Sequence, residues 1–306
     1  DMINAELLNT HSTFTQTSSI SYTPDENEQN NYYQILITDQ YEMSAASNVI
    51  RNWRQDFEFI LINQGEFTYG VSGEIVDLSY FEILKYPVAN IQFLDYLRDN
   101  LESFIFTYDD NSWVISSYFN HEVPNEVLGV LVDYFNLNKS RLIYDGNDFV
   151  VELGYEDHPI TGVTWYGSYD FAVKQEANLP SDQQWEKAAR GNLGYFYPWE
   201  EGISGGRANF FESNDPWDDS TTPIGFYNGQ NYNGFQTIDS PSIFGVYDLV
   251  GNVTEWTEKY NGSGQYFIKG GSYNDPISSE DLKSWQHELR YPNDNRNDLG
   301  FRIIKN

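Results

Sequence analysis

The stretch from Phe244 to Trp256 constrains the fold of this chain more than any other part of its sequence. Gly245 and Gly251 permit backbone conformations that a Cβ atom would forbid. Apolar residues large enough to anchor a core are spread through the same stretch: Val246, Leu249, Val253 and Trp256. The pattern predicts a tight turn that leads into a buried segment.

Oxygen ligands lie in the same stretch. Asn252 and Glu255 offer side-chain oxygen atoms three residues apart, and the carbonyl of Val253 lies between them. Calcium prefers ligands of this type. A tight turn beside a buried Trp would use the same residues, so the stretch leaves a calcium site and a structural turn equally open.

A second group of oxygen atoms comes earlier, in Ala208-Asn209-Phe210 and Asp215-Pro216-Trp217. Asn209 supplies an amide, Asp215 a carboxylate, and Phe210 and Trp217 supply carbonyls. Bound calcium would cross-link loops that lack a core of their own. Ordinary turns stabilised by Asx hydrogen bonds are the commoner use of such residues.

Charge excludes several classes of partner. The 306 residues carry 17 Lys and Arg against 46 Asp and Glu, a net charge of −29, which repels phosphate backbones and anionic lipid. Nucleic acid and membrane insertion are therefore not expected, and no apolar run approaches the ~18 residues of a membrane-spanning helix. Cations are suitable partners.

Cysteine is absent, which removes disulfides, thiolate metal sites and thiol nucleophiles. The absence does not fix the compartment. The abundance of Tyr, Phe, Trp, Asn, Ser and Gly with little Lys is typical of proteins outside the cell, so we expect an extracellular or cell-surface location. A start at Asp1 without a signal peptide suits a processed product and equally a shortened chain.

Two regions are predicted, an N-terminal arm over residues 1–56 and a domain over residues 57–306. Residues 1–31 are polar and rich in Thr, Ser and Tyr, which suits an extended strand held at the edge of a sheet, its own or that of a neighbouring copy. Tyr33–Thr38 is predicted as a strand and Ala45–Gln55 as a short helix.

Further elements are predicted from periodicity and turn residues in the first half of the domain. The expected strands are 57–62, 65–70 and 76–84, the expected helices follow Pro87 and cover 126–135, and the expected hairpins are 104–118 and 142–153. Residues 100–155 resemble an insertion and carry no recognisable chemistry.

Helix signals are clearest after His158. Thr164 is expected to cap one helix, and Ser181 with Gln184 forms a capping box for another that Gly191 ends. From Tyr197 to Ser242 the sequence is rich in Asn, Gly, Asp and Pro, so a long loop-rich segment is predicted there.

A series of short motifs runs in a fixed order from about residue 57 to the C-terminus. They are Tyr86-Pro87-Val88-Ala89-Asn90, His158-Pro159-Ile160, Val163-Thr164-Trp165, Leu179-Pro180-Ser181, Trp185-Glu186, Ala188-Ala189-Arg190-Gly191, Tyr197-Pro198-Trp199, Ala208-Asn209, Thr222-Pro223-Ile224-Gly225, Gly245-Val246-Tyr247-Asp248, Gly251-Asn252-Val253, Glu255-Trp256, Gly270-Gly271-Ser272 and Gly300-Phe301-Arg302. This series resembles the formylglycine-generating-enzyme/sulfatase-modifying-factor (FGE-sulfatase) family.

The resemblance implies an α+β domain with a variant of the C-type-lectin-like fold, irregular and loop-rich, here preceded by the extended N-terminal arm. It also implies two calcium sites. Carried over by position, one would use Asn209, Phe210, Asp215 and Trp217, and the other Asn252, Val253 and Glu255.

The resemblance fails at the catalytic centre. Enzymes of the family hold copper with two cysteines, and the positions where these would fall are occupied by Leu282 and His287. Leucine is neither a ligand nor a nucleophile, so we expect no copper and no formylglycine-generating activity. The four histidines of the chain do not show the spacing of an iron site.

Three functions remain, and the first two use the domain as a pseudoenzyme platform. The first is a calcium-stabilised extracellular structural protein that self-assembles through its N-terminal arm into a filament or surface layer. The second is an adhesin or receptor head that binds a glycan or a cell-surface protein through aromatic and amide side chains near the C-terminus. These are Tyr273, Asn274, Trp285, His287, Tyr291, Asn293 and Asn295.

The third is an enzyme of unrecognised type, which ranks last because no activated group can be named. The sequence favours the first function narrowly over the second. Core packing is the alternative role for Trp285 and Tyr291.

Overall fold

The computed structural model describes residues 57–306 except 110, 111, 124, 125, 127, 145, 147, 201 and 218, together with two short strands before them. These strands, β1 (Leu36–Thr38) and β2 (Ser44–Ala46), pair antiparallel. The chain divides into two compact units, residues 1–53 and 54–306. The predicted strand at Tyr33–Thr38 is thus present over its last three residues. The helix predicted from Ala45 is wrong at its start, because Ala45 pairs with Ile37 in β2; residues 1–31 lie outside the described residues.

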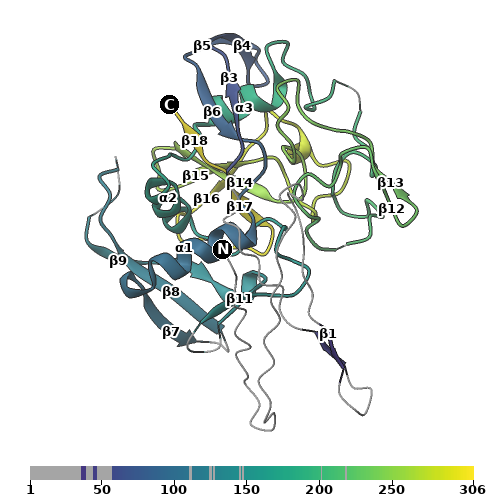
Figure 1. Cartoon of the computed structure of the whole chain (residues 1–306). Coiled ribbons are helices and arrows are strands. Elements are labelled where there is room, and N and C mark those ends of the chain that lie inside the picture. Colours follow the sequence, from purple (N-terminus) through teal and green to yellow (C-terminus); the bar gives the residue numbers. More distant parts are fainter. Residues whose placement is uncertain are drawn as a thin grey trace, which may run out of the picture. The chain divides into compact units, whose positions relative to one another are not determined.

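The larger unit is built on a four-stranded sheet, ordered β16 (Glu288–Arg290), β15 (Tyr266–Lys269), β14 (Thr254–Tyr260) and β17 (Leu299–Phe301). It lies at the centre of the domain in Figure 1. Only the β14–β17 pair is parallel within it. A three-stranded sheet joins β18 (Ile304–Lys305) to β6 (Phe81–Leu84) and β3 (Phe59–Ile62), so the two ends of the domain share one sheet.

The other strands form hairpins and one meander. The hairpins are β4 (Gly65–Tyr69) with β5 (Glu74–Leu78), β10 (Leu142–Tyr144) with β11 (Phe149–Val151), and β12 (Asn231–Tyr232) with β13 (Phe235–Gln236). The meander is β7 (Ile105–Asp109), β8 (Ser112–Phe119) and β9 (Val130–Asn136). These elements confirm the predicted α+β class and the hairpins predicted at 104–118 and 142–153.

Three α-helices begin where the sequence signals predict. They are α1 (Asn90–Asp99), α2 (Trp165–Lys174) and α3 (Asp182–Arg190), with short 3-10 turns at Leu101–Ser103, Leu137–Lys139 and Glu280–Leu282. The hydroxyl of Thr164 accepts from Gly167 N–H, and Ser181 and Gln184 form the reciprocal capping box. Gly191 ends α3 at a φ of 63°. None of the helices in the described part of the chain is long and apolar enough to cross a membrane.

Two predictions in the first half of the domain are wrong. The helix expected over 126–135 is instead the loop before β9 and most of β9 itself, which pairs with β8 from Phe119↔Val130 onward. Helix propensity there is overridden by pairing with a distant strand. The single strand expected over 76–84 is divided between β5, which ends at Leu78, and β6, which begins at Phe81.

Three tryptophans, Trp165, Trp185 and Trp256, lie at the centre of the core, and none is exposed. Each indole N–H has a partner: Trp165 donates to Thr257 O at 2.9 Å, Trp256 to Val163 O at 3.0 Å, and Trp185 to Glu255 Oε2 at 2.7 Å. Burial of such large side chains is favourable only when the N–H is satisfied. The indoles therefore fix the relative position of β14, α2 and α3.

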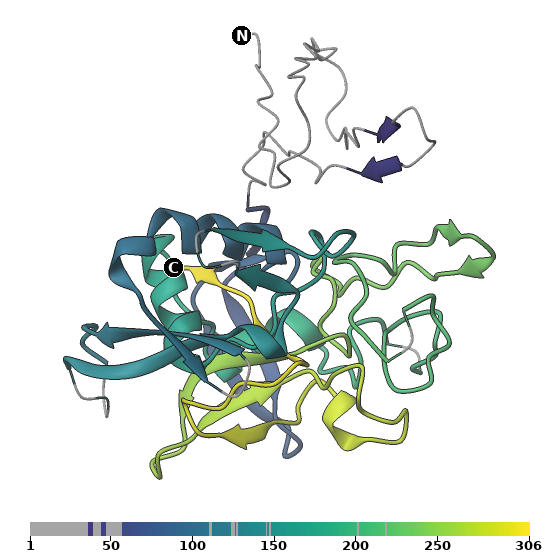
Figure 2. The same cartoon turned by 90° about the horizontal axis from the view of Figure 1, so that it is seen from below.

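The loop-rich segment predicted over 197–242 is confirmed, since β12 and β13 are its only described strands. It gathers on one side of the central sheet in both views (Figures 1 and 2). A small apolar cluster lies beneath it, formed by Ala208, Phe210, Val250 and Leu282. Such a cluster is too small to order a long loop alone, so polar contacts matter here.

Candidate binding surface

Glu255 and Arg302 form a buried ion pair between β14 and the chain after β17. Arg302 Nε donates to Glu255 Oε2 and Arg302 Nη2 to Oε1, both at 2.7 Å, and neither side chain is more than 1% exposed. Arg302 also donates to the carbonyls of Leu84 and Tyr247. A bidentate guanidinium–carboxylate pair is the strongest arrangement of these groups.

The two predicted calcium sets are neighbours. Asn252 N–H donates to the carbonyl of Asn209 at 2.7 Å, and Gly251 has a φ of +72° at a point where an added Cβ would lie 2.1 Å from the same carbonyl oxygen. The side chain of Asn252 accepts from Thr222 N–H at 3.0 Å and donates to Thr222 O at 3.2 Å. Direct hydrogen bonds therefore join the three loops that carry Asn209, Thr222 and Asn252.

The first set suits calcium in its donor chemistry. Asp215 offers a carboxylate, which already accepts from Ser213 Oγ at 2.6 Å and Trp217 N–H at 2.7 Å. Asn209 donates its amide N–H to Ser220 O, and no hydrogen bond to its Oδ1 is found among the described residues. One carboxylate, one amide and two carbonyls are oxygen ligands of the kind that calcium takes.

The second set suits a cation poorly. Both oxygens of Glu255 accept from Arg302, and Oε2 also accepts from Trp185. A buried guanidinium beside the carboxylate repels a second cation. Within the described residues, no three imidazole or carboxylate groups come together as a metal site, so any calcium would depend on amide and carbonyl oxygens. Calcium at both sets stays a prediction.

One carboxyl group, that of Asp248, and one amine, that of Lys269, lie near these sets and have shifted pKa values. Burial raises the pKa of Asp248 to about 6, although Gly225 N–H and Arg302 favour its charged form. Burial lowers the pKa of Lys269, and the nearby Glu186 carboxylate opposes that shift. The Lys269 ammonium lies 3.0 Å from Glu186 Oε2, and Arg190 lies 2.7 Å from Oε1.

This second buried charge cluster, Glu186 with Arg190 and Lys269, was not predicted from the sequence. One signal was available: charged residues stand beside Trp185, Ala188 and Ala189 on the face of α3 that the apolar residues bury. Charges on a buried helix face require partners. Lys269, the partner of Glu186 on β15, is distant in sequence, so no local pattern indicates this pair.

The two residues that the resemblance places at the family's catalytic cysteines differ from each other in their surroundings. Leu282 is fully buried against Ala208 and Phe210, and His287 is exposed with its ring stacked on Phe267 at 3.9 Å. Burial and the charge of Lys269 lower the pKa of His287. A gap beside His287, bordered by Thr254, Lys269, Asp281 and Glu288, leaves no room for a water molecule. The chain has no cysteine and therefore offers no thiolate ligand.

The residues predicted to bind a ligand divide into two groups. Tyr273 is only 5% exposed, and its hydroxyl accepts from Asn297 Nδ2 at 2.9 Å; Asn274 is exposed but donates to Asp298 at 3.0 Å. Trp285 is half-buried against Phe196, whose ring centroid lies 4.6 Å away. Asn295 is half-buried and donates to the carbonyl of Asn293 at 3.4 Å. Tyr273, Trp285 and Asn295 are thus buried at least in part, and the side chain of Asn274 is engaged by Asp298.

The other three remain accessible. His287 and Tyr291 flank β16, and Asn293 follows them; all three are exposed, Tyr291 to 57%. We call His287, Tyr291 and Asn293 the C-terminal surface. Phe196, which was not among the predicted residues, is 61% exposed and extends the aromatic contact at Trp285.

The C-terminal surface stands on a rigid support. Asp298 is 3% exposed and accepts from Ser272 Oγ at 2.9 Å and from Arg296 at 2.6 Å. The carbonyl of Pro292 accepts from Trp165 N–H at 3.0 Å, which attaches the loop to the start of α2. Hydrogen bonds at Pro292 and at Asp298 thus attach the loop to the rest of the domain.

Comparison with known proteins gives consistent matches. The profile of the sulfatase-modifying factor enzyme 1-like domain matches residues 46–306. A serine/threonine-protein kinase pkn1 of Chlamydia pneumoniae is 29% identical over 81% of this chain, and the chain spans 38% of that kinase. An inactive C-alpha-formylglycine-generating enzyme 2 of Bos taurus is 31% identical over 48% of this chain and 50% of its own length. The chain thus spans half or less of these curated relatives.

Solved structures agree in fold. CarF superposes with a TM-score of 0.54 at 18% identity, covering 82% of this chain and 98% of its own. PvdO from Pseudomonas aeruginosa gives 0.53 at 20% identity, covering 81% and 93%. Variable protein 1 of Treponema denticola gives 0.50 at 15% identity, covering 81% and 95%. At these identities the likeness concerns the fold alone.

Proposed function

Because the chain belongs to the family of sulfatase-modifying factor enzyme 1-like domains yet has no cysteine, we propose that it is a non-catalytic binding head. Its C-terminal surface captures a glycan or a protein. The family's C-type-lectin-like fold supplies the platform. The exposed Tyr291 and Asn293 on a hydrogen-bonded loop, with the exposed His287 at the other end of β16, carry the proposal, because aromatic and amide groups bind at a low entropic cost.

Two observations support a non-catalytic role. Leu282 places a buried aliphatic side chain where the resemblance puts one of the cysteines. A relative of 31% identity is itself named an inactive enzyme. Self-assembly through residues 1–31 stays a prediction, since these residues lie outside the described part of the chain.

Alanine at Tyr291 is expected to weaken ligand binding by about tenfold or more, because an exposed aromatic anchor contributes over ~1.4 kcal/mol at a binding surface. Screening on glycan and cell-surface protein arrays finds the ligand, and surface plasmon resonance measures its affinity. Tyr80→Ala is the matched control, since Tyr80 is also 61% exposed but precedes β6. If the arrays yield no ligand, or if the Tyr291→Ala and Tyr80→Ala variants bind it with equal affinity, the proposed binding function is wrong.

The proposal includes calcium at the first set only, bound by Asn209, Phe210, Asp215 and Trp217. Calcium at ~100 times its dissociation constant stabilises by about 2.7 kcal/mol, which raises the melting temperature of a domain of this size by roughly 5–10 °C. We therefore expect protein in calcium to melt above protein in EDTA, measured by scanning calorimetry. Asp215→Asn is expected to lose this difference. Equal melting temperatures of the wild type in both buffers would contradict calcium binding.

A further inference from the structure

One face of the β15–β16 pair carries a row of uncharged side chains. Phe267 pairs with Leu289 across these strands. Alternate residues of a strand point to the same face, so His287 and Tyr291 project on the side of Leu289. The His287 ring lies parallel to that of Phe267 with centroids 3.9 Å apart, and a Cβ added to Gly264 would lie 4.0 Å from the Tyr291 ring. We call His287, Phe267, Leu289 and Tyr291 the aromatic strip.

The aromatic strip is accessible. The opposite face of β15 belongs to the core, where Tyr266 and Ile268 are buried. On the strip, Phe267 and Leu289 are half-buried, whereas His287 and Tyr291 at its two ends are exposed. β16 is an edge strand of the four-stranded sheet. The strip thus extends the C-terminal surface along the margin of the sheet.

The size of the strip favours a small ligand. Tyr291 follows His287 by four positions, which corresponds to ~13 Å of strand, and neighbouring strands lie ~4.8 Å apart. The strip therefore offers an area on the order of 100 Å², whereas each partner of a standard protein–protein interface buries ~800 Å². A short oligosaccharide can cover the whole strip, but a folded protein would need most of its contacts elsewhere.

Charge favours a neutral ligand. Burial lowers the pKa of His287, so its imidazole is uncharged at neutral pH, like the other side chains of the strip. Arg290 and Arg296, in the same segment, are paired with Glu288 and Asp298. The net charge of −29 repels sulfated or sialylated sugars, and these two guanidinium groups are already neutralised.

Amide groups with free hydrogen-bonding capacity border the strip. The pairing of Tyr266 with Arg290 places Gln265 opposite Tyr291. Gln265 Oε1 accepts from Asn261 at 3.2 Å, but its Nε2 donates to no other described residue. The exposed side chain of Asn293 likewise makes no hydrogen bond within the described ranges. Amides both donate and accept, which matches the hydroxyl groups of a sugar.

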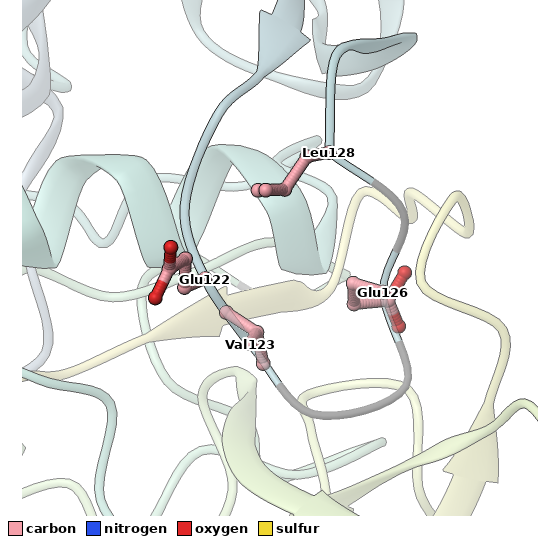
Figure 3. A pocket seen from close by; sticks show the side chains of 4 residues that line it. All are labelled: Glu122, Val123, Glu126 and Leu128. Atoms are coloured by element: carbon pink, nitrogen blue, oxygen red, sulfur yellow. The ribbon is translucent and has the colours of Figure 1, made fainter.

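A hollow of about 390 Å³ on the β8–β9 connection does not compete for such a ligand. Its two carboxylates, Glu122 and Glu126, lie on opposite arms of the connection and point apart (Figure 3). Groups that diverge in this way do not converge on one bound molecule.

We propose that the aromatic strip binds a neutral oligosaccharide. Its sugar rings pack on His287 and Tyr291, because aromatic side chains offer both apolar area and a polar edge. Its hydroxyl groups bond to Gln265 and Asn293. This inference rests on the proposed binding function and names the class of ligand for it.

A printed array tests the class of ligand. It carries neutral oligosaccharides, the same oligosaccharides with sialic acid or sulfate, and cell-surface proteins. We expect the full chain to bind within the neutral set, with an affinity that changes less than about twofold between ~0.05 M and ~0.5 M salt. Binding to acidic sugars or to proteins alone would overturn this inference and leave the binding head intact. Binding to nothing would remove both.

Variants then test the strip with the neutral oligosaccharide of highest affinity, by titration calorimetry. His287→Asp is expected to bind at least tenfold more weakly than His287→Phe, because only phenylalanine keeps an uncharged ring at this exposed position. Asn293→Ala is expected to lose about fivefold through one hydrogen bond. The matched control is Asn138→Ala, also exposed but in the 3-10 turn after β9, which is expected to bind like the wild type. Equal affinities of the two His287 variants, or of the two asparagine variants, would overturn the proposal.

Discussion

Replacing Arg302 with methionine is expected to lower the free energy of unfolding by about 3–5 kcal/mol, because it leaves Glu255 charged and buried. Glu255 would retain only the indole N–H of Trp185 from its present partners. The carbonyls of Leu84 and Tyr247 would also lose a donor. Urea unfolding followed by tryptophan fluorescence measures the change.

The control for Arg302→Met is Arg98→Met. Arg98 pairs with Asp148 at 2.7 Å, but both side chains are more than two-fifths exposed, so the loss is expected to be about 1 kcal/mol or less. The double variant Arg302→Met/Glu255→Met removes both buried charges and is expected to lose less than the sum of the two single changes. If Arg302→Met and Arg98→Met unfold at the same urea concentration, the buried pair stabilises the domain no more than the exposed pair does.

Gly251→Ala is expected to lower the free energy of unfolding by about 4 kcal/mol or more. A Cβ at this position would lie 2.1 Å from the carbonyl oxygen of Asn209, and the φ of +72° is already unfavourable for alanine. The backbone of Asn209 cannot move away without breaking its hydrogen bond to Asn252 N–H. Thermal and urea unfolding both report the loss.

Gly245→Ala separates the two causes. Gly245 has a φ of +91°, but a Cβ there would meet no atom within 4 Å. The loss of stability is then only the cost of holding alanine in a left-handed backbone conformation, about 1–2 kcal/mol. If Gly251→Ala and Gly245→Ala destabilise the domain equally, the backbone near Asn209 moves away from the added Cβ at no cost in free energy. The close approach to Asn209 would then not be the reason that glycine is required at position 251.

Local signals predicted local structure well. The Thr164 cap, the Ser181–Gln184 capping box and the hairpins about residues 109–111 and 145–146 depend on residues a few positions apart, and all are confirmed. The wrong prediction at residues 126–135 concerns a strand whose partner is β8. Pairing of that kind is decided by packing and not by local propensity.

The sequence predicted which residue types the candidate surface contains, but not which of those residues are accessible to a ligand. Tyr291, His287 and Asn293 are exposed as expected, whereas Tyr273 is buried by its contact with Asn297. Glu255 was assigned to calcium because its chemical type fits, but its partner Arg302 comes from a distant segment. A sequence names the groups that could meet at a site, and only the fold decides which of them already have partners.

The sheet that joins β18 to β6 and β3 has a consequence for biosynthesis. Ile304 pairs with Ile83, and Phe59 to Ile62 pair with the other edge of β6. During translation, the early strands leave the ribosome long before residue 304 exists, so β6 exposes an open edge to other chains until then. The nascent domain is therefore vulnerable to aggregation throughout its synthesis, and its final closure is a slow, long-range step that would benefit from a chaperone.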